Sequence, residues 1–121
     1  MNIKKLISFF VRLITYELIY MELELFLLLL SAHFVGDFAF QSSWMSIEKA
    51  RSWEITLYHS LVYTATFVLF RIDVTLLSLI ILASSHFIIE PLKPRWGIIK
   101  YIWQDQLLHI AVLIFVFLVT K

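Results

Sequence analysis

The stretch LFLLLLSAHFVGDFAFQ at residues 25–41 sets His33, Asp37 and Gln41 at intervals of four inside an apolar run. Three more apolar stretches follow it, and the four are each 16 to 20 residues long. At 1.5 Å per residue such helices measure about 24–30 Å, near the lower limit for crossing a bilayer. The connection at residues 71–73 is so short that the second and third stretches must run antiparallel. The predicted fold is an all-α, antiparallel four-helix bundle in the membrane over residues 23–121, with spans at residues 23–41, 55–70, 72–90 and 101–120.

The composition of the chain supports a membrane protein. Of the 121 residues, 61% are hydrophobic and 16% are charged, whereas an ordinary soluble domain has about 45–50% and about 25%. A soluble monomer of this length buries only about two-thirds of its surface, so it would expose many of its apolar side chains to water. We therefore expect the lipid bilayer as a partner. The net charge of +1 gives no reason to expect nucleic acid, and because the chain has no cysteine, nitrogen and oxygen atoms must hold any metal ion.

Residues 1–22 form a segment of a different kind, with polar residues on one face of a helical wheel and apolar residues on the other. We predict an amphipathic helix that lies in the membrane interface, or an oblique extension of the first span. A third interpretation is that Met21 is the start used in the cell and the segment is dispensable. A cleaved signal peptide fits less well because Arg12 interrupts the apolar region. The polar sector consists of Lys4, Lys5, Ser8, Arg12, Thr15 and Tyr16.

Ionisable residues inside the predicted spans are the main functional signal. Each span contains one histidine, and three spans also carry a carboxylate four residues from it, which places the two on one helix face. In an antiparallel bundle, nearly all of these side chains fall in the same half of the bilayer. Charged groups there cost several kcal/mol (about 2.5–3.5 for one residue at a helix centre) unless they are paired, so they mark functional sites. The set comprises His33, Asp37, His59, His86, Glu90, Asp105 and His109.

Three interpretations of this set remain open. A structural network would hold the helices together by hydrogen bonds without chemistry. A metal site would use imidazole and carboxylate ligands for Zn²⁺, Mn²⁺ or Fe²⁺ and activate a water molecule for hydrolysis. A proton or ion pathway would relay charge, and four short helices make a small pore unless the protein forms a homo-oligomer. For the metal site we predict His33, Asp37, His86, Asp105 and His109 as ligands, Glu90 and His59 as base or catalytic residues, and Gln41, Lys93 and Gln106 as residues around them.

Basic residues gather in the two connections above this set. We predict that residues 42–54 form a short interfacial helix. Its Lys49 and Arg51, together with Lys93, Arg95 and Lys100, either anchor the protein at the interface or receive a lipid phosphate.

The order and spacing of the polar motifs resemble those of a known family. The motifs are His33-Phe34-Val35-Gly36-Asp37-Phe38-x2-Gln41, a single histidine at His59, Ser85-His86-Phe87-x2-Glu90-x2-Lys93 and Asp105-Gln106-x2-His109. Over residues 23–120 the chain resembles the small bacterial integral-membrane proteins catalogued as domain of unknown function 3307. This resemblance implies a multi-pass protein of the bacterial inner membrane, with no settled activity.

Two details qualify what the resemblance implies. The third motif of the family ends in Asp, whereas this chain has Glu90, and the longer side chain predicts a different ligand geometry at this position. Similar His-x3-Asp patterns occur in a group described as membrane-bound metal-dependent hydrolases. By analogy with that group we expect a hydrolase acting on a lipid-linked or interfacial substrate. The alternative is a non-enzymatic scaffold or an ion-conducting subunit with a structural polar core.

Overall fold

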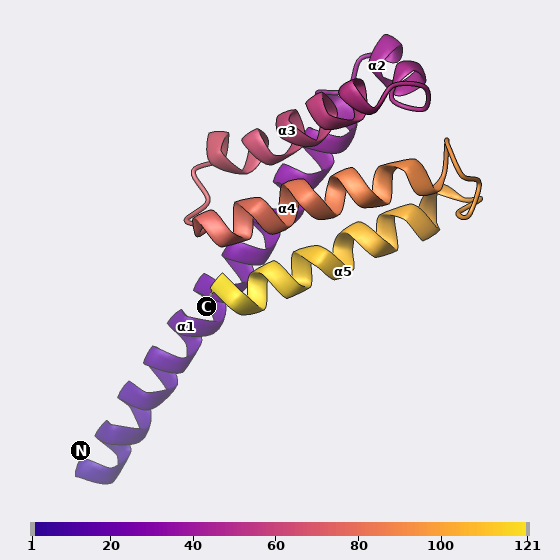
Figure 1. Ribbon diagram of the computed structural model, residues 1–121. Helices are drawn as coiled ribbons and strands as arrows, with labels where there is room; N and C mark the ends of the chain where they lie inside the picture. Colours follow the sequence, from indigo (N-terminus) through magenta and orange to yellow (C-terminus); the bar gives the residue numbers. More distant parts are fainter. Residues whose placement is uncertain (1, 121) are drawn as a thin grey trace.

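The computed structural model describes residues 2–120, and this part of the chain consists of helices and their connections, without strands (Figure 1). The expected all-α fold is confirmed. A helix covers most of each predicted apolar stretch, and the predicted helix between the first two stretches is present as well. The elements are α1 (Ile3–Phe34), the π-helical segment η1 (Val35–Ala39), α2 (Ser43–Glu48), α3 (Trp53–Leu69), α4 (Leu76–Ile89), the 3₁₀ segment η2 (Glu90–Leu92) and α5 (Ile102–Thr120).

Polar caps fix where the helices begin. The side chains of Ser42, Ser52 and Thr75 each accept a hydrogen bond from a backbone N–H in the first turn of α2, α3 and α4. Thr75 thereby starts α4 four residues later than the apolar pattern at residue 72 suggested. Pro91 ends the regular part of α4, as expected, because its ring cannot continue the α-helical hydrogen bonds.

The four long helices close into a bundle. Helix α4 packs between α3 and α5, and α1 contacts both α3 and α5 from the other side. In Figure 1, α3, α4 and α5 alternate in direction, and α1 crosses behind them at an angle. The tight α3–α4 turn uses a left-handed backbone at Arg71 (φ 54°) and buries the side chain of Ile72. The connections at residues 40–52 and 93–101 therefore lie together at the opposite end of the bundle from this turn.

The interior of the bundle is divided into an apolar part and a polar part. The apolar part lies near the α3–α4 turn and contains Leu29, Phe67, Leu82, Leu113 and Val116, all completely buried. The polar part lies toward the connections and contains the four histidines, which are at most 2% exposed. Buried polar groups must be paired or must hold a ligand, so this end of the bundle is where function is to be sought.

Helix α1 continues without a break through residue 22, so no boundary separates the N-terminal segment from the first predicted span. Its first half extends beyond the bundle (Figure 1), and residues 2–24 are exposed. Two regions, Ile3–Ala39 and Ile102–Thr120, are long and apolar enough to cross a membrane. A signal sequence, or the core helix of a soluble protein, can be equally long and apolar.

Gly36 lets η1 approach α3 more closely than a residue with a Cβ atom would allow. A Cβ atom here would lie 2.9 Å from Thr66 Oγ1 and 3.2 Å from the backbone Cα of Tyr63. We expect Gly36→Ala to lower the free energy of unfolding by about 1–3 kcal/mol because the added methyl group overpacks this contact. Thermal unfolding in detergent measures the effect, with the exposed neighbour Ala39→Val as control. A Gly36→Ala protein as stable as the unmutated one would contradict the prediction.

Candidate metal centre

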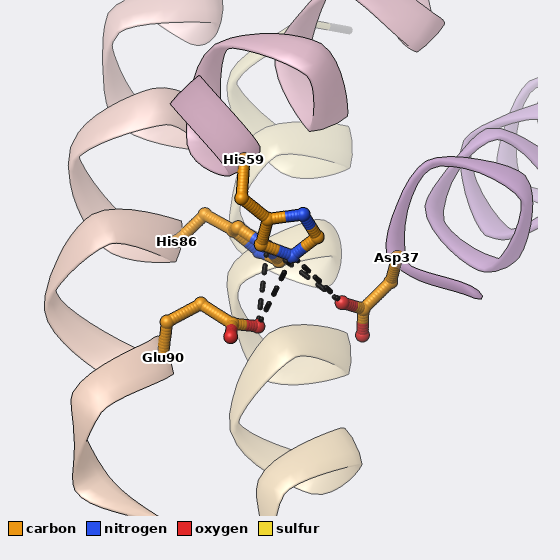
Figure 2. Close-up of side chains that lie close together, drawn as sticks. All are labelled: Asp37, His59, His86 and Glu90. Carbon is orange, nitrogen blue, oxygen red and sulfur yellow. Dashed lines mark hydrogen bonds and ion pairs between the residues drawn. The ribbon is translucent and has the colours of Figure 1, made fainter. Parts of the chain in front are cut away.

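Four buried side chains, each from a different helical element, point toward one another (Figure 2). Asp37 comes from η1, His59 from α3, His86 from the last turn of α4, and Glu90 from the start of η2. Both histidines are 0% exposed, Asp37 is 4% exposed and Glu90 is 5% exposed. One ligand atom from each residue lies within 4.8 Å of the other three. We call these residues the four-residue group.

The distances within the four-residue group match the size of a tetrahedral metal shell. His59 Nε2 lies 3.4 Å from Asp37 Oδ1 and 3.5 Å from Glu90 Oε1. His86 Nε2 lies 3.7 Å and 3.3 Å from the same two oxygens, and 3.0 Å from His59 Nε2. Bonds of about 2.0–2.1 Å to a central ion place neighbouring tetrahedral ligands about 3.3–3.4 Å apart. The ligand atoms therefore fit a metal ion of this size with small adjustments.

The tautomers of the two histidines decide whether the four-residue group can hold a cation. His59 Nε2 and His86 Nε2 are 3.0 Å apart, so only one of them can carry the hydrogen between them. With the ring hydrogens on Nδ1, the two Nε2 lone pairs and the two carboxylate oxygens face one another. A metal ion between them would accept one electron pair from each of the four atoms and remove the repulsion.

A second group of possible ligands adjoins the first and shares Asp37 with it. It consists of Asp37, Asp105 and His109. His109 Nε2 is buried and has no hydrogen-bond partner among residues 2–120. It lies 3.8 Å from Asp105 Oδ1 and 3.9 Å from Glu90 Oε1, so it faces carboxylate oxygens beyond hydrogen-bonding distance. Asp37, Asp105 and His109 could therefore hold a further metal ion beside the four-residue group.

Gln106 connects the two groups to His33. The Gln106 side-chain NH₂ donates to Asp37 Oδ2 at 3.0 Å and to Asp105 Oδ2 at 3.3 Å. The Gln106 Oε1 atom must then accept the hydrogen of His33 Nε2 at 2.8 Å, which leaves His33 Nδ1 to accept from the Tyr63 hydroxyl at 3.0 Å. Both ring nitrogens of His33 are occupied, and His33 lies outside both groups. This position differs from the ligand role that we expected for it.

The family of the chain is known from comparison with family models. The family described as "Protein of unknown function (DUF3307)" matches residues 25–121 of the chain. The chain belongs to the DUF3307 family. No curated protein and no solved structure matches it. The resemblance suggested by the polar motifs is therefore confirmed for DUF3307, while the similarity to membrane-bound metal-dependent hydrolases stays a prediction.

The structure brings the other predicted residues of this DUF3307 chain together, and their roles stay predictions. Asp37 and His86, predicted as ligands, lie in the four-residue group. Asp105 and His109, also predicted as ligands, lie in the adjoining group. His59 and Glu90, predicted as base or catalytic residues, lie in the four-residue group itself.

Two residues at the site were not among the predicted site residues. The Lys49 ammonium donates to Gln41 Oε1 and forms an ion pair with Glu90 Oε2. The Tyr63 ring stacks on the His86 ring, with centroids 3.7 Å apart and an angle of 8° between the planes. Tyr63 lies four residues after His59 on one helix, and this spacing was a signal that could have identified it. For Lys49 the signal was its position in the connection above the polar set.

A cavity of about 630 Å³ opens beside the four-residue group. Asp37, Glu90 and Asp105 form part of its wall, so a molecule in the cavity would contact carboxylates of both groups. Gln41 and Lys93, which we predicted around the site, also line it. The DUF3307 chain therefore combines a set of possible metal ligands with space for a second molecule next to them.

Proposed function

We propose that this DUF3307 protein is a multi-pass protein of the bacterial inner membrane. It holds a divalent transition-metal ion and hydrolyses a lipid-linked or interfacial substrate. The observation that carries the proposal is the convergence of two imidazole nitrogens and two carboxylate oxygens, all buried, at the spacing of a metal shell. The ligands would be Asp37, His59, His86 and Glu90, a set that suits Zn²⁺, Mn²⁺ and Fe²⁺.

The exposed surface of the long helices supports the membrane location. The regions Ile3–Ala39 and Ile102–Thr120 each contain an apolar stretch of 18 residues. In each stretch, 17% is buried inside the bundle. A core helix of a soluble protein would be mostly buried, whereas these helices present apolar side chains to their surroundings. Phe115 on α5 is 52% exposed, and Leu118 is 59% exposed. Continuous apolar surfaces of this kind favour contact with lipid over contact with water.

The position of Asp105 supports the hydrolytic part of the proposal. A bound metal ion supplies a water molecule that is activated at neutral pH. Asp105 lines the cavity and adjoins the four-residue group through Asp37, so its carboxylate can accept the proton of such a water molecule.

The hydrogen-bond chain through His33 does not favour the ion-pathway alternative. The chain runs from the cavity through Gln106 and His33 to the Tyr63 hydroxyl. Tyr63 is 2% exposed and packs edge-on against Phe67, a completely buried residue of the apolar part of the interior. A proton on this path therefore meets apolar packing before it reaches the other end of the bundle. A homo-oligomeric scaffold remains as the alternative.

The test is a metal analysis of protein extracted in detergent from membranes washed with alkaline carbonate. We expect the protein to remain with the washed membranes and to contain about one transition-metal ion per chain. Asp37→Asn should lose the ion because it removes a charged ligand. Asp73→Asn, which neutralises an exposed carboxylate in the α3–α4 turn, is the matched control and should keep it. Protein that binds no metal after reconstitution, although it is folded, would support the scaffold alternative.

The same preparation tests hydrolysis with chromogenic esters in mixed micelles. Activity should follow the metal content across samples. Asp105→Asn should lower the rate by about 100-fold, the size typical of losing a general base, while the metal content stays unchanged. If metal-loaded protein hydrolyses no class of ester, the hydrolytic part of the proposal is wrong and metal binding alone is supported.

A further inference from the structure

Two lysine side chains line the cavity without taking part in the ligand groups. Lys93 follows η2, and Lys100 lies just before α5. Their ammonium groups have no ion pair or hydrogen bond within residues 2–120, whereas Lys49 is bound to Glu90. Lys93 is partly buried and Lys100 is exposed, and both contribute positive charge to the cavity wall. Positive side chains on the wall of a cleft attract anionic ligands.

The charges of the cavity wall indicate which kind of anion. The wall contains three lysines and three carboxylates, whose charges cancel when all are ionised. The divalent ion of the proposed function, on which this inference rests, would add two positive charges. A phosphate monoester carries about 1.5–2 negative charges at neutral pH, so it matches this excess. The six residues are Lys49, Lys93, Lys100, Asp37, Glu90 and Asp105.

The shape of the cavity fits a molecule with a polar end and an apolar end. Its volume of about 630 Å³ lies within the range of small-molecule sites, about 300–1,000 Å³. The buried carboxylates of Asp37 and Glu90 form the inner wall. Phe38 and Ile102, which are 50% and 60% exposed, form part of the outer rim. A phosphate group would lie inside, and the remainder of the ligand would lie along the rim.

We propose that this cavity binds the phosphate group of a phosphate monoester and that Lys93 and Lys100 hold its anionic oxygens. Lysine is a common phosphate ligand because its ammonium is a compact point charge with three donors. The metal ion on the inner wall would contact the same phosphate group. Inorganic phosphate and the headgroup of phosphatidic acid share this chemistry, so they are the two probes of the site.

The experiment measures binding of each probe to zinc-loaded protein by calorimetry. Inorganic phosphate is titrated directly, and phosphatidic acid is presented in phosphatidylcholine nanodiscs, with phosphatidylcholine alone as the blank. We expect Lys93→Gln with Lys100→Gln to weaken binding about 100-fold, since a charge-assisted hydrogen bond is worth about tenfold each. Lys5→Gln, which removes a lysine from the exposed half of α1, is the control and should bind as the unmutated protein does.

The outcomes separate this inference from the proposed function. The zinc content of every variant is measured before the probe is added, and neither lysine belongs to the ligand groups. Failure of the unmutated protein to bind zinc, manganese or iron means that the proposed function fails. Normal zinc content with no binding of either probe, or with equal binding by the double variant, overturns the phosphate site alone. Binding of either probe that the double variant weakens supports the site. Binding of phosphatidic acid alone identifies a lipid phosphate, and binding of inorganic phosphate alone identifies a phosphate group that is not carried by a lipid.

Discussion

His86→Ala is expected to lower the affinity of the protein for Zn²⁺ by about 100- to 1,000-fold. Structural zinc sites with four ligands bind with about 10–16 kcal/mol, so one ligand contributes about 3 kcal/mol, which corresponds to this range. His86 Nε2 lies within 3.7 Å of three other ligand atoms of the four-residue group, and alanine cannot replace it. Competition with a chromogenic chelator measures the affinity.

The control for His86→Ala must separate loss of a ligand from loss of folding. Leu82→Ala lies one turn earlier on α4 and removes a completely buried side chain of the apolar part of the interior. It should cost about 2–5 kcal/mol of stability because it leaves a cavity, yet each folded chain should bind Zn²⁺ as before. Equal zinc affinity in His86→Ala and Leu82→Ala would mean that His86 is not a ligand.

The architecture could be predicted from the sequence because its signals are local and strong. Four apolar stretches, a three-residue connection and Pro91 are sufficient to place the long helices and their directions. The antiparallel order of the four apolar stretches indicated that their polar side chains share one end of the bundle. The start of α4 was placed four residues too early because Val74 and Ile72 belong to the apolar pattern but lie before the Thr75 cap.

The roles within the site could not be predicted because they depend on contacts between helices. We assumed that His33 and Asp37 lie on one α-helical face. The chain instead changes to a π-helix at Val35, where the Phe40 N–H bonds to the Val35 carbonyl five residues earlier. Asp37 lies in this π-helical segment and faces His59, and the periodicity of the sequence does not indicate the change. π-Helical turns are frequent at functional sites, which agrees with its place here.

The long side chain of Glu90 also acts in a way that spacing does not reveal. Its two carboxylate oxygens face different partners. Oε1 faces the histidines of the four-residue group, while Oε2 pairs with Lys49. Lys49 reaches this point from the connection after α2, more than forty residues away in the chain. Contacts between distant parts of a chain cannot be inferred from one sequence, so Glu90 could be placed in the polar set but not in the four-residue group.

Gln106→Leu is expected to destabilise the protein by about 2–4 kcal/mol and to weaken zinc binding by about 10- to 100-fold. Leucine has nearly the same size but leaves Asp37 Oδ2 without its donor and the His33 Nε2 hydrogen without its acceptor, and each such loss costs about 1–3 kcal/mol. The effect on zinc follows because the Gln106 amide orients the ligand Asp37, and partners that orient ligands have effects of this size. Thermal unfolding of metal-free protein and chelator competition measure the two effects.

The matched control is Gln104→Leu, two residues nearer the start of α5. Gln104 Oε1 accepts hydrogen bonds from the exposed backbone N–H groups of Lys100 and Tyr101, which water can satisfy instead. We therefore expect the free energy of unfolding to fall by at most about 1 kcal/mol and the zinc affinity to stay unchanged.

The tautomer of His33 gives a signal that a general loss of packing would not produce. In the unmutated protein, the Gln106 carbonyl fixes the ring hydrogen on Nε2, and the Tyr63 hydroxyl donates to Nδ1. ¹⁵N NMR of labelled histidine should therefore show one dominant tautomer. Without the Gln106 acceptor, the hydrogen loses its preference for Nε2, and the two ring nitrogens should move toward averaged chemical shifts. If the Gln106→Leu protein keeps the His33 tautomer and its zinc affinity, Gln106 does not connect His33 to the metal ligands, and the hydrogen-bond chain has no role in positioning them.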